Sequence, residues 1–181
     1  MADSVIYRRA CQPDLTSLRL LATQVYLDTY ATQGISPTLA REVIGLFSEP
    51  AMALRLNSAD VEITVAEVDG HLVGFLDLTS GGDCPAASVQ GAEVRRLYVQ
   101  RTFHRAGIGR QLLRLAEERA AQRGSQWLWL TAWSGNGQAL AFYARVGYQD
   151  MGSAQHWIEG VAYENRVLAR QLNDPITRET P

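Results

Sequence analysis

Two closely spaced glycines in one segment could build an anion-binding loop. A strand ending at Leu97, Tyr98 and Val99 is followed by a short turn and then by a glycine-bearing helix start. The first N–H groups of a helix lack intrahelical partners, and the helix dipole favours negative charge there. Glycines let a phosphate approach the backbone closely, and nearby arginines add charge-assisted donors. The predicted phosphate loop consists of His104, Arg105, Ala106, Gly107, Ile108, Gly109 and Arg110.

Two familiar phosphate motifs do not fit this loop. A P-loop needs Gly-Lys-Ser/Thr at its end, and Arg110-Gln111 follow the second glycine instead. The dinucleotide-binding fingerprint needs three glycines, and only two are present here. Taken alone, the glycines could equally serve a simple turn before a helix.

The surrounding sequence resembles a known family. The stretch 93–113 resembles the acetyl-CoA motif of the GNAT N-acetyltransferases, which is Gln/Arg-x-x-Gly-x-Gly/Ala after a strand. Gly107 and Gly109 match its glycines, while His104 stands where the family usually has Gln or Arg. Downstream, 136–143 and Gly147-Tyr148 resemble the second motif of the family. The resemblance covers about residues 61–172, and the first 60 residues match only in the order of helices and strands.

The resemblance implies acetyl-CoA as co-substrate and assigns residues to it. In the family the glycine loop binds the CoA pyrophosphate, mainly through backbone amides, and the strand at 97–99 runs beside pantetheine. Asn136 corresponds to the asparagine that hydrogen-bonds the pantetheine arm, although it also suits a helix N-cap and could do both. The further residues that the second motif implies are Ala139, Phe142 and Tyr143.

Amide formation from a thioester requires a neutral amine, a polarised carbonyl and a proton for the leaving thiolate. The resemblance places Tyr143 near the CoA sulfur, where a phenol stays protonated at neutral pH and could act as general acid. The alternative is a tyrosine that only packs in the core. Glu93 is the candidate general base, directly or through water, and the alternative is a strand glutamate paired with Arg95 or Arg96.

These residues predict an N-acetyltransferase that moves the acetyl group of acetyl-CoA directly to a primary amine of a small molecule or peptide. Acetylation of a protein lysine or N-terminus, or non-catalytic binding of acyl-CoA, remain as alternatives. Trp133 and Trp157 are the tryptophans best placed for a substrate cleft, where they could contact a cationic amine. Trp127 and Trp129 are better explained as core residues.

Composition adds weaker expectations. The 181 residues are 46% hydrophobic with a formal net charge of -2, which is ordinary for one globular domain and argues against nucleic-acid binding. Cys11 and Cys84 have no metal-ligand spacing, so no metal is expected. Without a signal peptide or a membrane-length apolar run, we expect a cytoplasmic protein that does not bind membranes. The sequence leaves a homodimer open.

Hydrophobic periodicity and turn residues predict the elements that hold these residues. The predicted strands are 4–10, 61–65, 72–78, 93–99, 127–133, 155–160 and 163–171. The predicted helices open at Pro13-Asp14, at Ser36-Pro37, near Ile108 and at Asn136, with Pro50 dividing the second into two pieces. Asp14 is able to cap the free backbone N–H groups of the first helix. This order predicts an α+β fold with a mixed, largely antiparallel twisted sheet and helices on both faces. We expect a single domain over 1–173 and a frayed tail over 174–181.

Overall fold

The computed structural model describes residues 4–86, 88–158 and 160–172. Its helices are α1 (Leu15–Tyr30), α2 (Pro37–Leu46), α3 (Glu49–Asn57), α4 (Ile108–Gln122) and α5 (Gly137–Arg145). Its strands are β1 (Ile6–Arg9), β2 (Val61–Val68), β3 (His71–Thr79), β4 (Gly91–Val99), β5 (Trp127–Trp133), β6 (Gln149–Ile158) and β7 (Val161–Gln171). The predicted tail, 174–181, lies outside the described residues.

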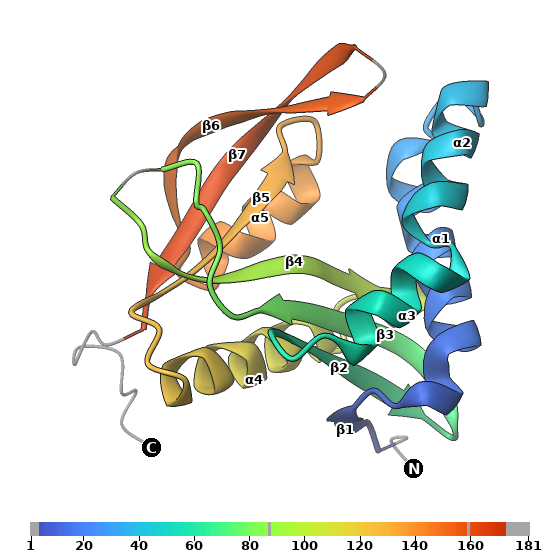
Figure 1. Ribbon diagram of the computed structural model, residues 1–181, viewed down its shortest axis with the longest axis horizontal. Helices are drawn as coiled ribbons and strands as arrows, with labels where there is room; N and C mark the ends of the chain where they lie inside the picture. The colour runs from blue at the N-terminus through green and yellow to red at the C-terminus, as the bar shows by residue number, and fades with distance from the viewer. Residues whose placement is uncertain (1–3, 87, 159, 173–181) are drawn as a thin grey trace.

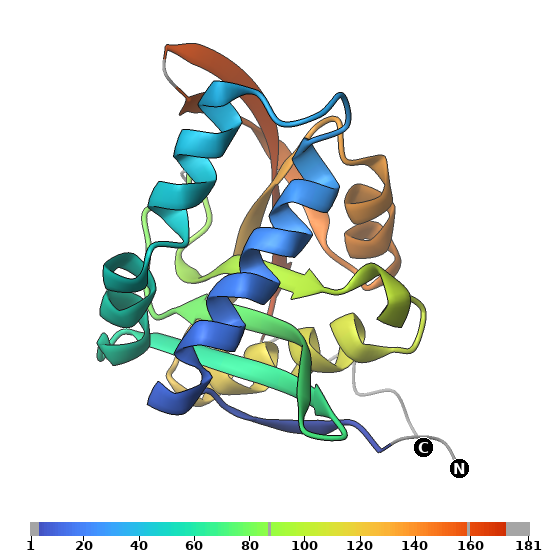
Figure 2. The same cartoon turned by 90° about the vertical axis from the view of Figure 1, so that its right-hand side faces the viewer.

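The strands of the described residues form one mixed sheet in the order β1-β2-β3-β4-β5-β7-β6. The β4–β5 pair is parallel and the other neighbouring pairs are antiparallel. Helices cover both faces: α1 and α3 pack on one, and α4 packs on the other (Figures 1 and 2). The predicted α+β class is therefore confirmed. No helix among the described residues is both long and apolar enough to span a membrane.

Each face of the sheet has its own hydrophobic core. On one side, Leu18 of α1 and Met52 of α3 are fully buried together with Phe75 of β3. On the other side, Leu112 of α4 packs with Leu128 of β5. The helices are therefore fixed to the sheet by apolar burial, which is the dominant favourable term in folding.

Local signals place several helix starts as the sequence predicts. The hydroxyl of Ser36 accepts a hydrogen bond from the Leu39 N–H (3.1 Å), and Pro37 occupies the first turn of α2. Pro50 lies in the first turn of α3, so the predicted division into two helices is confirmed. The Asn136 side chain accepts from the Ala139 N–H (3.0 Å), which makes Asn136 the N-cap of α5.

Two local predictions are wrong. Asp14 does not cap α1 with its side chain; its carboxylate instead accepts from the Arg8 guanidinium at 2.7 and 2.8 Å and from the Cys11 N–H at 2.8 Å. The sixth strand begins at Gln149 rather than 155, because its first half already pairs with β7. An irregularity between Asp150 and Gly152 breaks the alternation by which a strand is recognised in sequence.

A buried ionic cluster ties α3 to the centre of the sheet. Asp77 of β3 is fully buried and accepts from Arg55 of α3 at 2.6 and 2.9 Å. It also accepts from Arg96 of β4 at 2.9 Å, and that guanidinium lies over the Phe47 ring at 5.4 Å. Removal of one member would leave an uncompensated buried charge, so these elements are held in one arrangement.

The parallel strands β4 and β5 pair over a short distance and then separate. Their register is limited to Gly91, Ala92 and Glu93 of β4, opposite residues 127–129 of β5. Both strands continue beyond these pairs, and they diverge in Figure 1. At the first pair the backbones are so close that a Cβ on Gly91 would collide with the Trp127 carbonyl. The two strands therefore form a V that is closed at Gly91 and open toward their carboxyl ends.

We expect Gly91→Ala to destabilise the protein by about 1–3 kcal/mol, because an added methyl group would force the backbones of β4 and β5 apart. The free energy of unfolding in urea measures this. Gly45→Ala is the matched control: its Cβ would meet nothing within 4 Å in α2, and it should be neutral or stabilising. Equal stabilities of the two variants would contradict the close approach at Gly91.

Candidate functional site

Helix α4, which follows β4, begins without a side-chain cap on the backbone N–H groups of its first turn. Gly107 is the N-cap of α4 in a left-handed conformation (φ +80°), and it has no side chain with which to cap the helix. The first helical hydrogen bond runs from the Gln111 N–H to the Gly107 carbonyl. A Cβ on Gly107 would meet nothing within 4 Å, so space is open beside this backbone. By contrast α2, α3 and α5 each begin with a side-chain cap.

The rest of the predicted phosphate loop supports this geometry. Arg105 also has a positive φ (+66°), which is uncommon outside glycine and turns the chain sharply. His104 Nε2 lies 2.9 Å from the Val99 carbonyl, and its Nδ1 lies 3.4 Å from Gln138 Nε2 of α5. A neutral imidazole with its proton on Nε2 would donate to the first and accept from the second. The histidine therefore ties the loop to both β4 and α5.

The V places an open strand edge beside this loop. Along β4, Leu97, Tyr98 and Val99 pair with β3 on one side, whereas their pairing with β5 has already ended. The chain then passes through residues 101–103 and the loop into α4 (Figure 2). An extended amide-bearing molecule could pair with the open edge while its anionic end lies at the start of α4.

Three tyrosines from separate elements influence one another's ionisation, and one of them, Tyr30, lies against Trp133 at the carboxyl end of β5. Tyr143 of α5 is only 7% exposed, and its ring packs edge-on against Phe142 at 5.2 Å. Burial raises the pKa of Tyr143 above its usual value, with a further contribution from Tyr30 of α1. Burial also raises the pKa of Tyr98 of β4, and both Tyr30 and Tyr143 contribute. Because burial disfavours the charged form, each of these phenols stays protonated at neutral pH.

Glu93 lies at the closed end of the V, away from these phenols. It is paired with Trp129 of β5 in the last position before the strands separate. Burial raises the pKa of Glu93, and the nearby Arg95, whose Nη1 lies 3.8 Å from the carboxylate, opposes that rise. Five residues along a strand span roughly 16 Å, so Glu93 and the side chain of Tyr98 lie far apart. The structure therefore does not bring Glu93 and Tyr143 into contact.

Comparison with known proteins agrees with this geometry. The sequence profile described as the Acetyltransferase (GNAT) family matches residues 30–148, well over half of the chain. This protein belongs to the GNAT acetyltransferase family. An uncharacterized N-acetyltransferase of Lactobacillus delbrueckii subsp. lactis is 25% identical over 137 residues, which cover 75% of this chain and 79% of the relative. An uncharacterized N-acetyltransferase of Mycobacterium tuberculosis is 29% identical over 142 residues, which cover 75% of this chain and 86% of that relative.

Solved structures share the GNAT fold. The PaiA N-acetyltransferase from Thermoplasma acidophilum, in complex with coenzyme A, has a TM-score of 0.72 and 21% identity. The match covers 93% of this chain and 99% of that one. The yncA protein of Salmonella typhimurium, with its cofactor acetyl-CoA, has a TM-score of 0.66 and 16% identity. That match covers 94% of this chain and 95% of the yncA chain.

Two tryptophans of this GNAT protein lie in or against the core, as the sequence predicts. Trp129 is buried in a small core cluster, and Trp127 packs against the same cluster. Trp133, at the carboxyl end of β5, lies 5.7 Å from the ring of Tyr30. Trp157 of β6 is 65% exposed. Trp133 thus borders the tyrosine cluster.

Sequence reasoning missed two residues near the open part of the V. Tyr30 comes from the last turn of α1 and contacts Trp133, and the charge of Glu42 of α2 adds to the rise that burial causes in the pKa of Tyr30. Both belong to the first 60 residues, which resemble the GNAT pattern only in the order of elements. An aromatic residue or a glutamate on an amphipathic helix carries no local signal of a site, because its neighbours here are distant in sequence.

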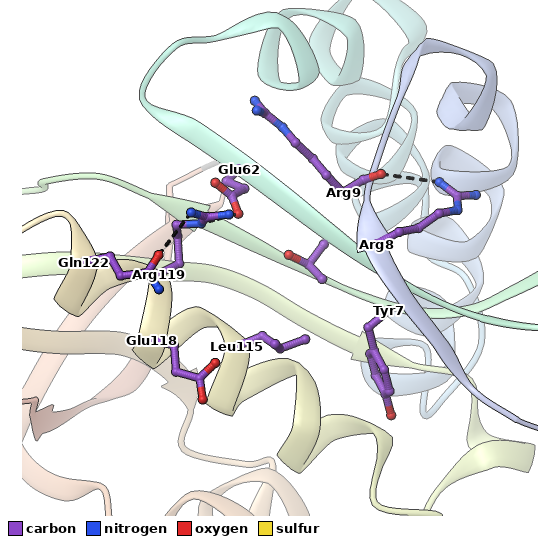
Figure 3. Close-up of a pocket in the computed structure, with 9 residues that line it drawn as sticks. Tyr7, Arg8, Arg9, Glu62, Leu115, Glu118, Arg119 and Gln122 are labelled. Atoms are coloured by element: carbon purple, nitrogen blue, oxygen red, sulfur yellow. Dashed lines mark hydrogen bonds and ion pairs between the residues drawn. The ribbon is translucent and has the colours of Figure 1, made fainter.

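A separate hollow of about 220 Å³ lies on another part of the molecule (Figure 3). It is lined by residues of β1, β2 and α4, and within it Arg119 Nε lies 2.9 Å from Glu62 Oε1. None of the predicted site residues line it. Among the described residues, no cluster of His, Cys, Asp or Glu could hold a metal ion.

Proposed function

We propose that this GNAT protein transfers the acetyl group of acetyl-CoA directly to a primary amine. The observation that carries the proposal is the open edge of β4 beside the start of α4, which has no side-chain cap. Its backbone could pair with the amides of pantetheine while Gly107, Gly109 and the N–H groups around them bind the pyrophosphate. The structures of PaiA with coenzyme A and of yncA with acetyl-CoA, which share this fold, support the choice of ligand.

The chain's residues would then act on a thioester held near the tyrosines. The amine nitrogen attacks the thioester carbon, the C–S bond breaks, and the electron pair leaves on sulfur. The pKa of the buried Tyr143 is raised, so its hydroxyl keeps its proton and offers a hydrogen bond to the thiolate as it forms. The proton lost by the amine passes to Glu93 through ordered water, because the two sites are not in contact.

The arrangement around the tyrosines favours a small acceptor over a folded protein. Glu42 of α2 and His156 of β6 approach to 3.9 Å, so elements from opposite ends of the chain meet near the tyrosines. A short peptide or an aliphatic amine could enter more readily than a lysine on a structured surface. A release assay for CoA thiol with amines, amino acids and peptides as acceptors tests the proposal, and it fails if none of them accelerates thiol release.

We expect Gly109→Val to abolish most CoA binding while the fold survives. A Cβ at this position meets Phe142 and Val99 only at ordinary distances of 3.7 and 3.9 Å, so packing tolerates it. The larger side chain would occupy the space where phosphate meets the backbone. A CoA concentration of 100 Kd should stabilise the parent by about 2.7 kcal/mol. Thermal shift measures this, and an equal shift in the variant would place the pyrophosphate elsewhere.

Tyr143→Phe should lower kcat by about 10²–10⁴-fold with little change in acetyl-CoA affinity, because the hydroxyl acts mainly as the C–S bond breaks. Single-turnover rates measure the chemical step directly. Tyr148→Phe is the control: its hydroxyl bonds Glu117 at 3.2 Å, so its loss should reduce stability and leave kcat unchanged. Similar kcat losses in both variants would assign Tyr143 a packing role.

Glu93→Gln should remove the acidic limb of the pH profile of kcat/KM. A base works when deprotonated, and burial raises the pKa of Glu93, so activity should rise with pH through a value above that of an ordinary glutamate. Glu118→Gln, on the exposed face of α4, is the control and should keep the limb. A limb that persists unchanged in Glu93→Gln would show that water or another group is the base.

A further inference from the structure

His104 of the phosphate loop holds the end of the open edge of β4. The Gln100 N–H donates to the Val73 carbonyl of β3 at 2.9 Å. Val99, one residue earlier, stands opposite Gly74 in the same ladder. Bonded and non-bonded pairs alternate in an antiparallel ladder, so the backbone groups of Val99 face away from β3, toward the open edge. His104 Nε2 lies 2.9 Å from the Val99 carbonyl and occupies this acceptor.

The same imidazole also reaches helix α5. Its Nδ1 lies 3.4 Å from Nε2 of Gln138, the second residue of α5. With the amide nitrogen donating, Nδ1 is the acceptor and the ring proton is on Nε2, where the Val99 carbonyl requires it. Both contacts thus select one neutral tautomer of His104. The side chain links the end of β4 to the first turn of α5, which lies beside the segment between β4 and α4 in Figure 2.

A second, apolar contact joins the loop to α5 one turn later. A Cβ on Gly109 would lie 3.7 Å from Phe142 Cζ, so this ring adjoins the first turn of α4. Phe142 also packs against the core cluster that contains the buried Ile108. The next residue is Tyr143, whose ring lies 5.2 Å from that of Phe142. Helix α5 is therefore held against the loop by a polar contact at its start and by packing beside Tyr143.

We propose that His104 and Gln138 are positioning residues that couple the phosphate loop to Tyr143. This inference rests on the proposed acetyl transfer. Pyrophosphate bound in the loop fixes His104, the contact with Gln138 passes this order to α5, and the Tyr143 hydroxyl is thereby aligned with the sulfur of the donor. Binding energy from a part of the donor that is remote from the reacting bond is in this way used in the transition state.

Hydrogen exchange tests the coupling without turnover. Saturating CoA should slow amide exchange over residues 140–147 of the parent, and pantetheine, which lacks the pyrophosphate and the nucleotide, should slow it far less. In Gln138→Leu the slowing by CoA over 140–147 should fall by about 3–10-fold, the worth of one hydrogen bond, while the slowing over 104–111 is kept. Gln138 is exposed, so the leucine leaves the core intact. Equal slowing of α5 in parent and variant would overturn the inference.

A double-mutant cycle tests the route to the chemistry. Gln138→Leu should lower the single-turnover rate with saturating acetyl-CoA by about 3–10-fold in the parent. It should have no further effect in Tyr143→Phe, because the contact acts only through that hydroxyl. Gln122→Leu is the control: its Oε1 accepts from Arg119 at 3.1 Å at the far end of α4, and its loss should change neither rates nor exchange in α5.

Each other outcome has a definite meaning. No loss of rate in Gln138→Leu, or an equal loss in both backgrounds, would overturn this inference alone, because the effect would then bypass Tyr143. An unchanged rate in Tyr143→Phe would remove Tyr143 from the chemistry and the inference with it. Absence of acetyl transfer to any amine would overturn the proposed function instead, while the exchange experiment still decides whether the loop is coupled to α5.

Discussion

The separation of β4 from β5 is the constraint on which the site depends. Two parallel strands that begin as a close pair at Gly91 and then diverge leave part of a central strand unpaired with its neighbour. An unpaired edge in the middle of a sheet invites another extended chain. The same divergence gives the chain space to turn from the end of β4 into α4, whose first N–H groups have no side-chain cap. The open edge of β4 and the uncapped start of α4 therefore both follow from the divergence of β4 and β5.

The two faces of the sheet carry different helices and are held together by different interactions around this V. On one face, α4 and α5 pack through a continuous hydrophobic core and present the loop and Tyr143. On the other, α3 is held by the buried pairing of Arg55 and Arg96 with Asp77, while α1 packs over β3 and β4 and α2 packs against α1 and α3. Buried ion pairs contribute little net stability but strongly disfavour other arrangements, because an unpaired charge would remain. The position of α2, and with it Glu42, follows from that arrangement.

Electrostatics near the reaction site differ from those of the rest of the protein. Elsewhere, carboxylates of low exposure are neutralised by arginine, as at Asp14 and Glu62. Tyr143, by contrast, packs among apolar side chains and against the rings of Phe142 and Tyr148, and burial raises its pKa. Such surroundings suit a reaction that starts from a neutral amine and a neutral thioester, since developing charge is felt strongly where water is scarce.

The sequence by itself determined the order of elements, the starts of α2 and α5 and the glycine loop, because caps and turns depend on residues within a few positions of one another. Ser36, Asn136 and Gly107 could be assigned for this reason. Only the tertiary structure decided that β7 lies between β5 and β6, that β6 begins at Gln149, and that Asp14 binds Arg8 instead of capping a helix. It alone placed Tyr30 beside Trp133, and Glu93 at the closed end of the V. These contacts join segments distant along the chain, where side-chain burial and ion pairing outweigh local preference, and no short sequence pattern encodes which segments will meet.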